Sequence, residues 1–290
     1  MNNTRRSTAF CVLGLLIGSQ PMPVAAADVY RVGMLSLGGA TGGSKDFEAF
    51  RDRLNSLGYA EGRNLVIERR SAEGQFERLP ALAAELVRLN VDVIVTITTP
   101  AAQAAKAATS TIPIVMAGSA DPVGLGLVAS LARPGANLTG VTNSLEGINV
   151  KQLQLLKEAA PRSARVAVIM TRSSVEVTAF EKMQAASAAL GVAVVAFNSE
   201  SSNEIDLEGL SKLRADAVEA GGLMSYWTNW LELRRHAAVY VDKILNGARP
   251  ADLPVEQPTR FELVINLKTA KALGITIPQS ELLRADEVIQ

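Results

Sequence analysis

The sequence predicts an α/β protein built of two lobes, each with a parallel sheet. From residue 30 onward, apolar runs typical of buried strands alternate with amphipathic helix patterns. Aromatic residues make up 4% of the chain and apolar residues 48%. This bias favours Ala-rich helices on parallel strands over an all-β sandwich. The alternation restarts at residue 144, and 290 residues are enough for two medium-sized domains.

Residues 1–27 are expected to be an export signal. Arg5 and Arg6 supply the positive start, residues 9–18 the apolar core, and small residues up to Ala27 a cleavage site after Ala27. The ten-residue core is about half of the roughly 20 residues that a membrane-spanning helix needs. Cys11, the single cysteine, lies within this core. The mature chain would therefore contain no disulfide and no cysteine-ligated metal.

The first lobe is expected to span residues 28–143. A helix begins at Ser44 and stops at Gly58, and another begins at Thr99, with Thr as N-cap and Pro at the first helical position. The remaining expected elements are strands at 30–37, 64–71, 91–98, 112–118 and 138–143, and a helix at 77–89.

The second lobe is expected to span residues 144–290 and to repeat this order. After the strands at 165–170 and 191–198 and their helices, the order breaks at Ala217–Val218. No apolar strand follows, and a strand–helix–strand piece of roughly 30 residues is missing by comparison with the first lobe. The chain resumes with a short strand near 223–227 and a helix opened by Asn229 that turns Trp230, among others, inward.

Short polar residues follow the predicted strands at the edge where open parallel sheets bind ligands. Hydroxyl, amide and carboxylate groups can hold the carboxylate or the ammonium of a small solute. The alternative for each single residue is helix capping, but their recurrence at nearly every strand end favours a site. The candidates derived in this way are Ser36, Thr98, Thr99, Ser119, Asp121, Asn143, Ser173 and Ser174.

Other function classes find little support. Lys plus Arg and Asp plus Glu both number 29, so no basic surface for nucleic acid is expected. The loop at 38–45 has the order Gly-Ser-Lys, which misplaces the lysine and hydroxyl of a phosphate loop. The glycine pattern beginning at Gly124 is explained as a tight turn. His236 is the only histidine and lacks catalytic partners, so no enzyme, cofactor or metal is expected.

Long stretches of the chain closely resemble the substrate-binding proteins of bacterial ABC importers with a periplasmic-binding-protein type I-like fold. These stretches are 50–96, 110–143, 218–226 and 237–278. The resemblance implies two Rossmann-like lobes joined by hinge crossings near 143, 226 and 257. They would close in the periplasm on a small-molecule solute, which a membrane permease takes over, while a partner ATPase uses ATP. Some members are similar to aromatic amino-acid binders. The resemblance also implies that Ser225 and Tyr226 lie near the hinge.

The chain departs from the family pattern in two places. Thr171–Ser174 replaces an Asn-Pro pair that usually follows the first strand of the second lobe, and the family's Asp-Pro ligand loop is part of the piece missing after Ala217. Solute binding is therefore expected to be weaker than in complete relatives, or absent. The alternatives are a ligand sensor outside transport or a remnant that no longer binds. An exported α/β hydrolase is least favoured, because catalytic partners are lacking.

Overall fold

The structure, a computed structural model, describes residues 29–38, 45–143, 147–170, 174–198, 217–219, 223–272 and 274–290. The expected export signal and Ser173 lie outside these ranges. Within them, none of the helices has the length and apolar character needed to cross a bilayer.

The first lobe contains a parallel five-stranded sheet in the order β2-β1-β3-β4-β5. Strands β4 and β5 are buried along their whole length, because helices cover both faces of the sheet. The strands are β1 (Tyr30–Ser36), β2 (Leu65–Ser71), β3 (Val93–Ile97), β4 (Ile114–Ser119) and β5 (Leu138–Thr142).

Two helices pack on each face of this sheet. Helices α1 (Lys45–Ser56) and α7 (Trp230–Leu245) share one apolar core with Val95 and Val115. Helices α2 (Leu79–Arg88) and α3 (Thr99–Ala108) share the other with Ile94 and Met116. The 3₁₀ turn η1 (Phe76–Arg78) leads into α2, and η3 (Pro250–Asp252) follows α7.

The second lobe contains two three-stranded sheets around one apolar core. Strands β7-β6-β8 are parallel, whereas β10 pairs antiparallel with β9 and parallel with β11. The strands are β6 (Arg165–Met170), β7 (Ala193–Asn198), β8 (Ala217–Glu219), β9 (Met224–Thr228), β10 (Phe261–Asn266) and β11 (Glu287–Ile289). The helical elements are α4 (Ile148–Ala159), α5 (Ser174–Ser187), η2 (Ala188–Leu190), α8 (Leu267–Ala272) and α9 (Gln279–Arg284).

A short strand, which the sequence pattern does not predict, forms at the join expected at Ala217–Val218. Residues 217–219 of β8 pair with Val166–Val168 of β6 and satisfy backbone groups on that edge. Strand β6 therefore lies between β7 and β8, as β1 lies between β2 and β3. Among the described residues, no strands extend this sheet as β4 and β5 extend the first one. The described part of the second sheet thus has three strands, against five in the first.

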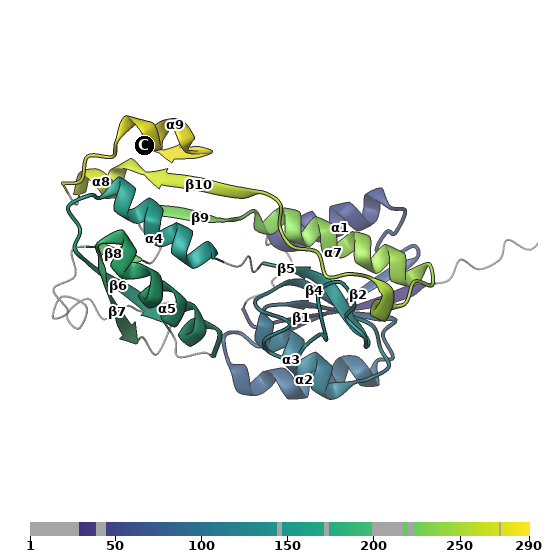
Figure 1. The fold of residues 1–290 in the computed structure, drawn as a ribbon. Coiled ribbons are helices and arrows are strands. Elements are labelled where there is room, and N and C mark those ends of the chain that lie inside the picture. Colours follow the sequence, from purple (N-terminus) through teal and green to yellow (C-terminus); the bar gives the residue numbers. More distant parts are fainter. Residues whose placement is uncertain are drawn as a thin grey trace, which may run out of the picture.

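The chain passes between the two lobes three times, as Figure 1 shows. The passages join β5 to α4, β9 to α7, and η3 to β10. The first and third run side by side, because Glu256 N donates to Gly140 O at 3.0 Å and Thr142 N donates to Glu256 O at 2.9 Å. Along the chain, α7 therefore comes after β9 and before β10 of the second lobe, yet it packs on the first lobe.

Tyr59 fastens the far end of α7 to the first lobe. Its hydroxyl donates to Asp242 Oδ1 at 2.9 Å and accepts from Asn246 Nδ2 at 3.3 Å. Burial, followed by the hydrogen bond and charge of Asp242, raises the pKa of Tyr59 from 10.0 to about 12. Below pH 10 both the folded and the unfolded chain keep this proton. Between pH 10 and 12 only the unfolded chain loses it, so stability falls as pH rises.

Replacing Tyr59 by phenylalanine should therefore remove part of the alkaline loss of stability. We expect Tyr59→Phe to cost about 1 kcal/mol at pH 7 through the lost hydrogen bond. Its urea midpoint should then decline less steeply than that of the wild type between pH 10 and 12. Burial also raises the pKa of Tyr240, so Tyr240→Phe should likewise make the urea midpoint decline less steeply at alkaline pH. Parallel curves for Tyr59→Phe and the wild type would contradict the assignment.

Candidate functional site

The carboxyl ends of the first lobe's strands bring most of the sequence-predicted residues to one edge. Thr99 Oγ1 accepts a hydrogen bond from Ala120 N at 2.9 Å, which links the loops after β3 and β4. Asn143 N donates to Ser119 O at 3.2 Å, which links β5 to β4. Ser36 ends β1, next in the sheet to β3, with Ile97 as its register partner.

Three of the predicted side chains have hydrogen-bond partners within the first lobe. Ser36 Oγ donates to Gly38 O at 2.8 Å, and Asp121 Oδ1 accepts from Gly124 N at 3.0 Å. The Ser36 and Asp121 bonds are local and typical of turn formation and capping, whereas the Thr99 bond joins two different loops. The contacts of Ser36 and Asp121 therefore agree with the capping alternative.

Four other side chains along this edge have a buried oxygen atom without a hydrogen-bond partner in the described part of the chain. They are Thr96 Oγ1, Thr98 Oγ1, Ser119 Oγ and Asn143 Oδ1. Leaving such a group unsatisfied costs about 1–3 kcal/mol, so buried polar atoms are normally paired. Four in successive loops and strand ends are consistent with a site that offers its hydrogen bonds to a ligand.

Thr96 is the member that sequence reasoning missed. It interrupts the run of Val and Ile in β3 and is fully buried. Threonine is a common strand former, so its occurrence in a strand carries no functional signal. The one feature in the sequence that sets Thr96 apart is its hydroxyl within an otherwise continuous apolar run.

Two residues of this edge have a strained backbone. Thr98 has φ 98° and ψ 153°, a region in which β-branched residues are rare. Asp121 has φ 41°, in the left-handed region. Such conformations cost about 1–3 kcal/mol each and cluster at ligand-binding sites. The strained positions follow adjacent strands, β3 and β4, and agree with a site at this edge.

The candidates from the second lobe are less clearly placed. Ser174 begins α5, and Ser225 is exposed on β9 opposite Val264. Tyr226 is half-buried and stacks on Phe261 with ring centroids 5.6 Å apart. Among the described residues, no hydrogen bond, ion pair or ring contact joins Ser225 or Tyr226 to the edge of the first sheet.

The second crossing also carries the two tryptophans of the chain. The rings of Trp227 and Trp230 lie 6.1 Å apart, and Trp227 Nε1 is buried without a partner among the described residues. Trp230 is 39% exposed, although the helical pattern predicts that it points inward. The prediction for Trp230 is therefore wrong, because this residue opens α7 beside the crossing.

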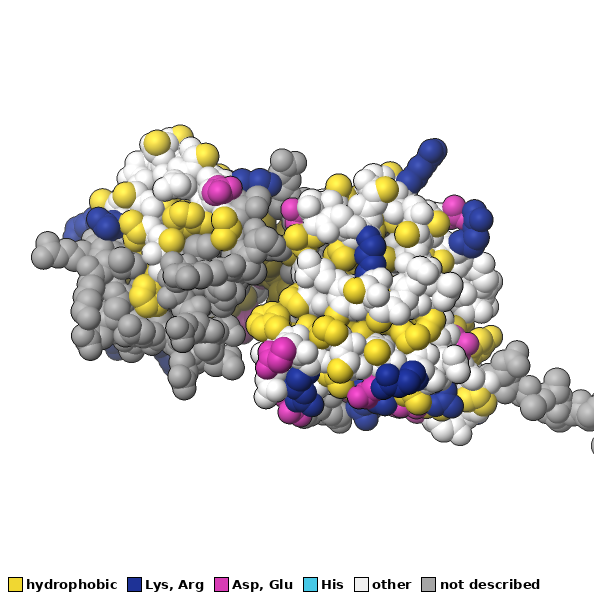
Figure 2. Space-filling view, turned by 90° about the horizontal axis from the view of Figure 1, so that it is seen from below, with side chains coloured by type: hydrophobic (Ala, Val, Ile, Leu, Met, Phe, Trp, Pro, Cys, Tyr) yellow, Lys and Arg dark blue, Asp and Glu magenta, His cyan; other side chains and the backbone are white. Residues whose placement is uncertain are grey.

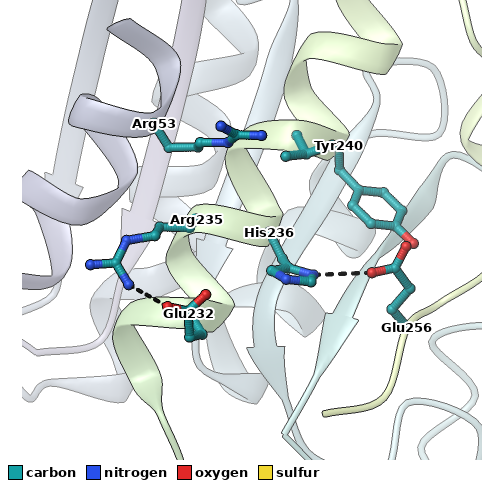
Figure 3. A pocket seen from close by; sticks show the side chains of 7 residues that line it. Arg53, Glu232, Arg235, His236, Tyr240 and Glu256 are labelled. Carbon is teal, nitrogen blue, oxygen red and sulfur yellow. Dashed lines mark hydrogen bonds and ion pairs between the residues drawn. The ribbon is translucent and has the colours of Figure 1, made fainter. Parts of the chain in front are cut away.

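A separate pocket lies on the outer side of α7 (Figure 3). It has a volume of about 470 Å³. His236 Nδ1 lies 3.1 Å from Glu256 Oε2, and Arg235 pairs with Glu232 at 2.6 Å. The side chain of His236 is 56% exposed, which agrees with a surface histidine. The pocket's charged groups are largely engaged with one another and exposed, so it is a weaker candidate than the sheet edge.

The surface charges agree with the neutral composition. Figure 2 shows the face on which α2 and α3 lie, where apolar side chains form a band and basic and acidic side chains lie near one another around it. That face offers no continuous basic surface to attract phosphates.

The fold and the sheet edge define a two-lobed binding protein, and sequence comparison names its class. The chain belongs to the ABC transporter substrate-binding protein family, whose family model matches residues 41–212 and 209–289. Proteins of this class are extracytoplasmic and deliver small-molecule ligands to an ABC permease.

Three relatives are informative. A tyrosine-binding protein of Clostridioides difficile is 29% identical over 265 residues, covering 79% of this chain and 76% of the relative. A conserved domain protein of Vibrio cholerae is 29% identical, with a TM-score of 0.79 over 90% of this chain and 100% of that chain. The ABC domain in complex with L-Trp from Streptococcus pneumonia is 27% identical, with the same TM-score and coverage.

The comparisons also bear on the shortened second lobe. The two pieces of the family match meet at 209–212, close to the join expected at 217–218. The place where the family match divides is close to the position at which the sequence analysis expects a missing piece.

Proposed function

We propose that this protein binds a small amino-acid-like solute between its two lobes and delivers it to the permease of an ABC importer. The observation that carries the proposal is the set of four buried, unpartnered oxygen atoms at the carboxyl edge of the first sheet. The protein itself would perform no chemistry, and ATP would be used by the partner ATPase.

The chemistry of this edge suits a zwitterion. The hydroxyls of Thr98 and Ser119 can donate to a carboxylate, and the start of α3 adds the positive end of a helix dipole. Asn143 Oδ1 and the Asp121 carboxylate can accept from an ammonium group. Relatives named for tyrosine and crystallised with L-Trp support an aromatic amino acid, and a small carboxylate is the next choice.

Closure of the lobes would complete the site. We propose that residues 28–143 move together with α7, which packs on α1 and on the first sheet. The remaining part of 144–290 would form the second jaw. The hinges would lie near 143, 226 and 257, with Ser225 and Tyr226 at the hinge near 226. Ser173 and Ser174 would face the solute from that side. Export to the periplasm, with cleavage after Ala27, is part of the same proposal.

A shortened second lobe would lower the affinity of the protein for its solute. A second jaw without its ligand loop would hold the solute through fewer contacts, so we expect weaker binding than in complete relatives. Loss of all binding would favour the remnant or sensor alternative.

A thermal melt of the chain from Asp28 to Gln290, alone and with amino acids and small carboxylates, tests the proposal. A solute at 100 times its dissociation constant adds about 2.7 kcal/mol, which raises the melting temperature by several degrees. We expect tyrosine or tryptophan to give the largest rise and a neutral sugar to give none. A cooperative melt that no solute moves, with no heat of binding by calorimetry, would refute solute binding.

A further inference from the structure

Arg234 is a buried cation that the sequence analysis did not single out. It lies on α7 with 4% of its surface exposed. Its Nη2 and Nε donate to Asp46 Oδ2 at 3.0 and 3.3 Å, and its Nη1 donates to the carbonyl oxygen of Ala117. One guanidinium thus joins α1, α7 and the carboxyl end of β4. Burial lowers the pKa of Arg234 and Asp46 opposes this effect.

The start of α7 packs tightly against the residue that precedes Ser119. Gly118 has φ 109°, and a Cβ atom there would lie 3.2 Å from Leu233, 3.3 Å from Arg234 and 3.4 Å from Trp230. The absence of a side chain at Gly118 lets the helix approach. Any shift of Arg234 would therefore be transmitted to β4, where Ser119 carries one of the unpartnered oxygens.

Arg234 also contacts an aromatic ring of the second crossing. Its guanidinium carbon lies 5.5 Å from the centroid of the Trp230 ring, within cation–π range. The Trp230 ring is partly exposed and lies beside that of Trp227. Arg234 thus contacts both Ala117 in β4, close to Ser119, and the Trp230 ring at the second crossing.

We infer that Arg234 is a positioning residue, which holds the carboxyl end of β4 and the ring of Trp230 in the arrangement that binds solute. The inference rests on the proposed function and adds a residue that need not touch the solute. Arginine suits this role because its planar fork donates to Asp46 and Ala117 at the same time, whereas a lysine ammonium is a single point of charge.

The experiment compares Arg234→Met with Arg234→Lys, with Arg235→Met as the matched control. Arg235 is the next residue on the helix, is 43% exposed and pairs with Glu232 within one turn. For the solute that raises the wild-type melt most, we expect Arg234→Met to weaken binding by about 10-fold or more, because supported sites tolerate little displacement. Arg234→Lys should recover only part of this loss, and Arg235→Met should bind like the wild type.

A second readout is independent of any ligand. The chain has two tryptophans, both at the second crossing, so fluorescence excited at a wavelength that tryptophan but not tyrosine absorbs reports on this region. We expect Arg234→Met to shift the emission and increase acrylamide quenching of the folded protein, and Arg235→Met to change neither. All measurements are made well below the melting temperature of each variant.

The outcomes separate this inference from the proposed function. If Arg234→Met is less stable but keeps the wild-type affinity and quenching, Arg234 is merely structural and the inference is overturned. If the wild type binds no solute, the proposed function fails, and quenching alone decides whether Arg234 positions the ring. If Arg234→Met does not fold, Asp46→Asn provides the same comparison, since Asp46 is 39% exposed.

Discussion

Replacing Gly140 by alanine is expected to destabilise the first lobe severely. Gly140 lies in β5 with φ 125°, and an added Cβ would lie 2.3 Å from the carbonyl oxygen and 2.6 Å from the nitrogen of Met116 in β4. Both atoms belong to the backbone of a strand that is paired on its two sides, so neither can move away alone. Gly140 O also accepts the hydrogen bond from Glu256 N that joins two hinge passages.

The size of the effect follows from two costs. A non-glycine residue at such a φ costs about 1–3 kcal/mol, and overpacking in a close-packed core costs about 1–3 kcal/mol more. Domains are stable by only about 5–15 kcal/mol, and displaced sheet hydrogen bonds add to the loss. By circular dichroism, we therefore expect Gly140→Ala to show no cooperative melt, or a melting temperature more than about 10 °C below that of the wild type.

Gly126→Ala is the control for Gly140→Ala. Gly126 has φ 64°, and a Cβ atom there would meet nothing within 4 Å. It therefore changes backbone strain without a steric clash and should cost about 1 kcal/mol. If the two variants melt at similar temperatures, the close approach of β5 to β4 at Gly140 is not a constraint on the fold.

The strands of the first lobe could be predicted because burial determines their sequence. The runs expected at 30–37, 64–71 and 138–143 correspond to β1, β2 and β5 within one residue at each end. Strands buried on both faces, such as β5, need continuous apolar residues, whereas the edge strand β2 is apolar only at its start and is partly exposed. Both signals are local. The helix predicted at Thr99 is present as α3, but its N-cap is Thr98 and Thr99 is already helical. The assignment of Thr99 as N-cap is therefore wrong, because the strained backbone of Thr98 shifts the start of the helix by one residue.

Features that depend on distant contacts could not be predicted. Helix α7 packs on the first lobe because its apolar side chains share a core with α1, far earlier in the chain. The pattern of apolar residues within α7 does not reveal which sheet the helix covers. Strand β8 forms from Ala217–Glu219, three residues that gain their pairing from β6. The unpartnered state of Thr96 and Ser119 is likewise a property of what surrounds them.

Replacing Ser119 by alanine is expected to stabilise the ligand-free protein and to weaken solute binding. The Oγ atom of Ser119 is fully buried and has no partner among the described residues. Such a group costs about 1–3 kcal/mol, and part of this is regained when the hydroxyl is removed. If a bound solute pairs with the hydroxyl, the variant loses that bond, and affinity falls about 10-fold for each 1.4 kcal/mol.

Thr99→Ala is the matched control, since Thr99 Oγ1 does accept a hydrogen bond, from Ala120 N. Its removal takes away the hydrogen bond from Ala120 N, so it should cost about 1 kcal/mol of stability and lower the melting temperature. The two variants should therefore move stability in opposite directions, and Ser119→Ala should lower the affinity measured by calorimetry. A Ser119→Ala protein that is less stable and binds as tightly as the wild type would show that this hydroxyl supports the fold. An oxygen left unpaired at a stability cost is better explained by a ligand that pairs with it.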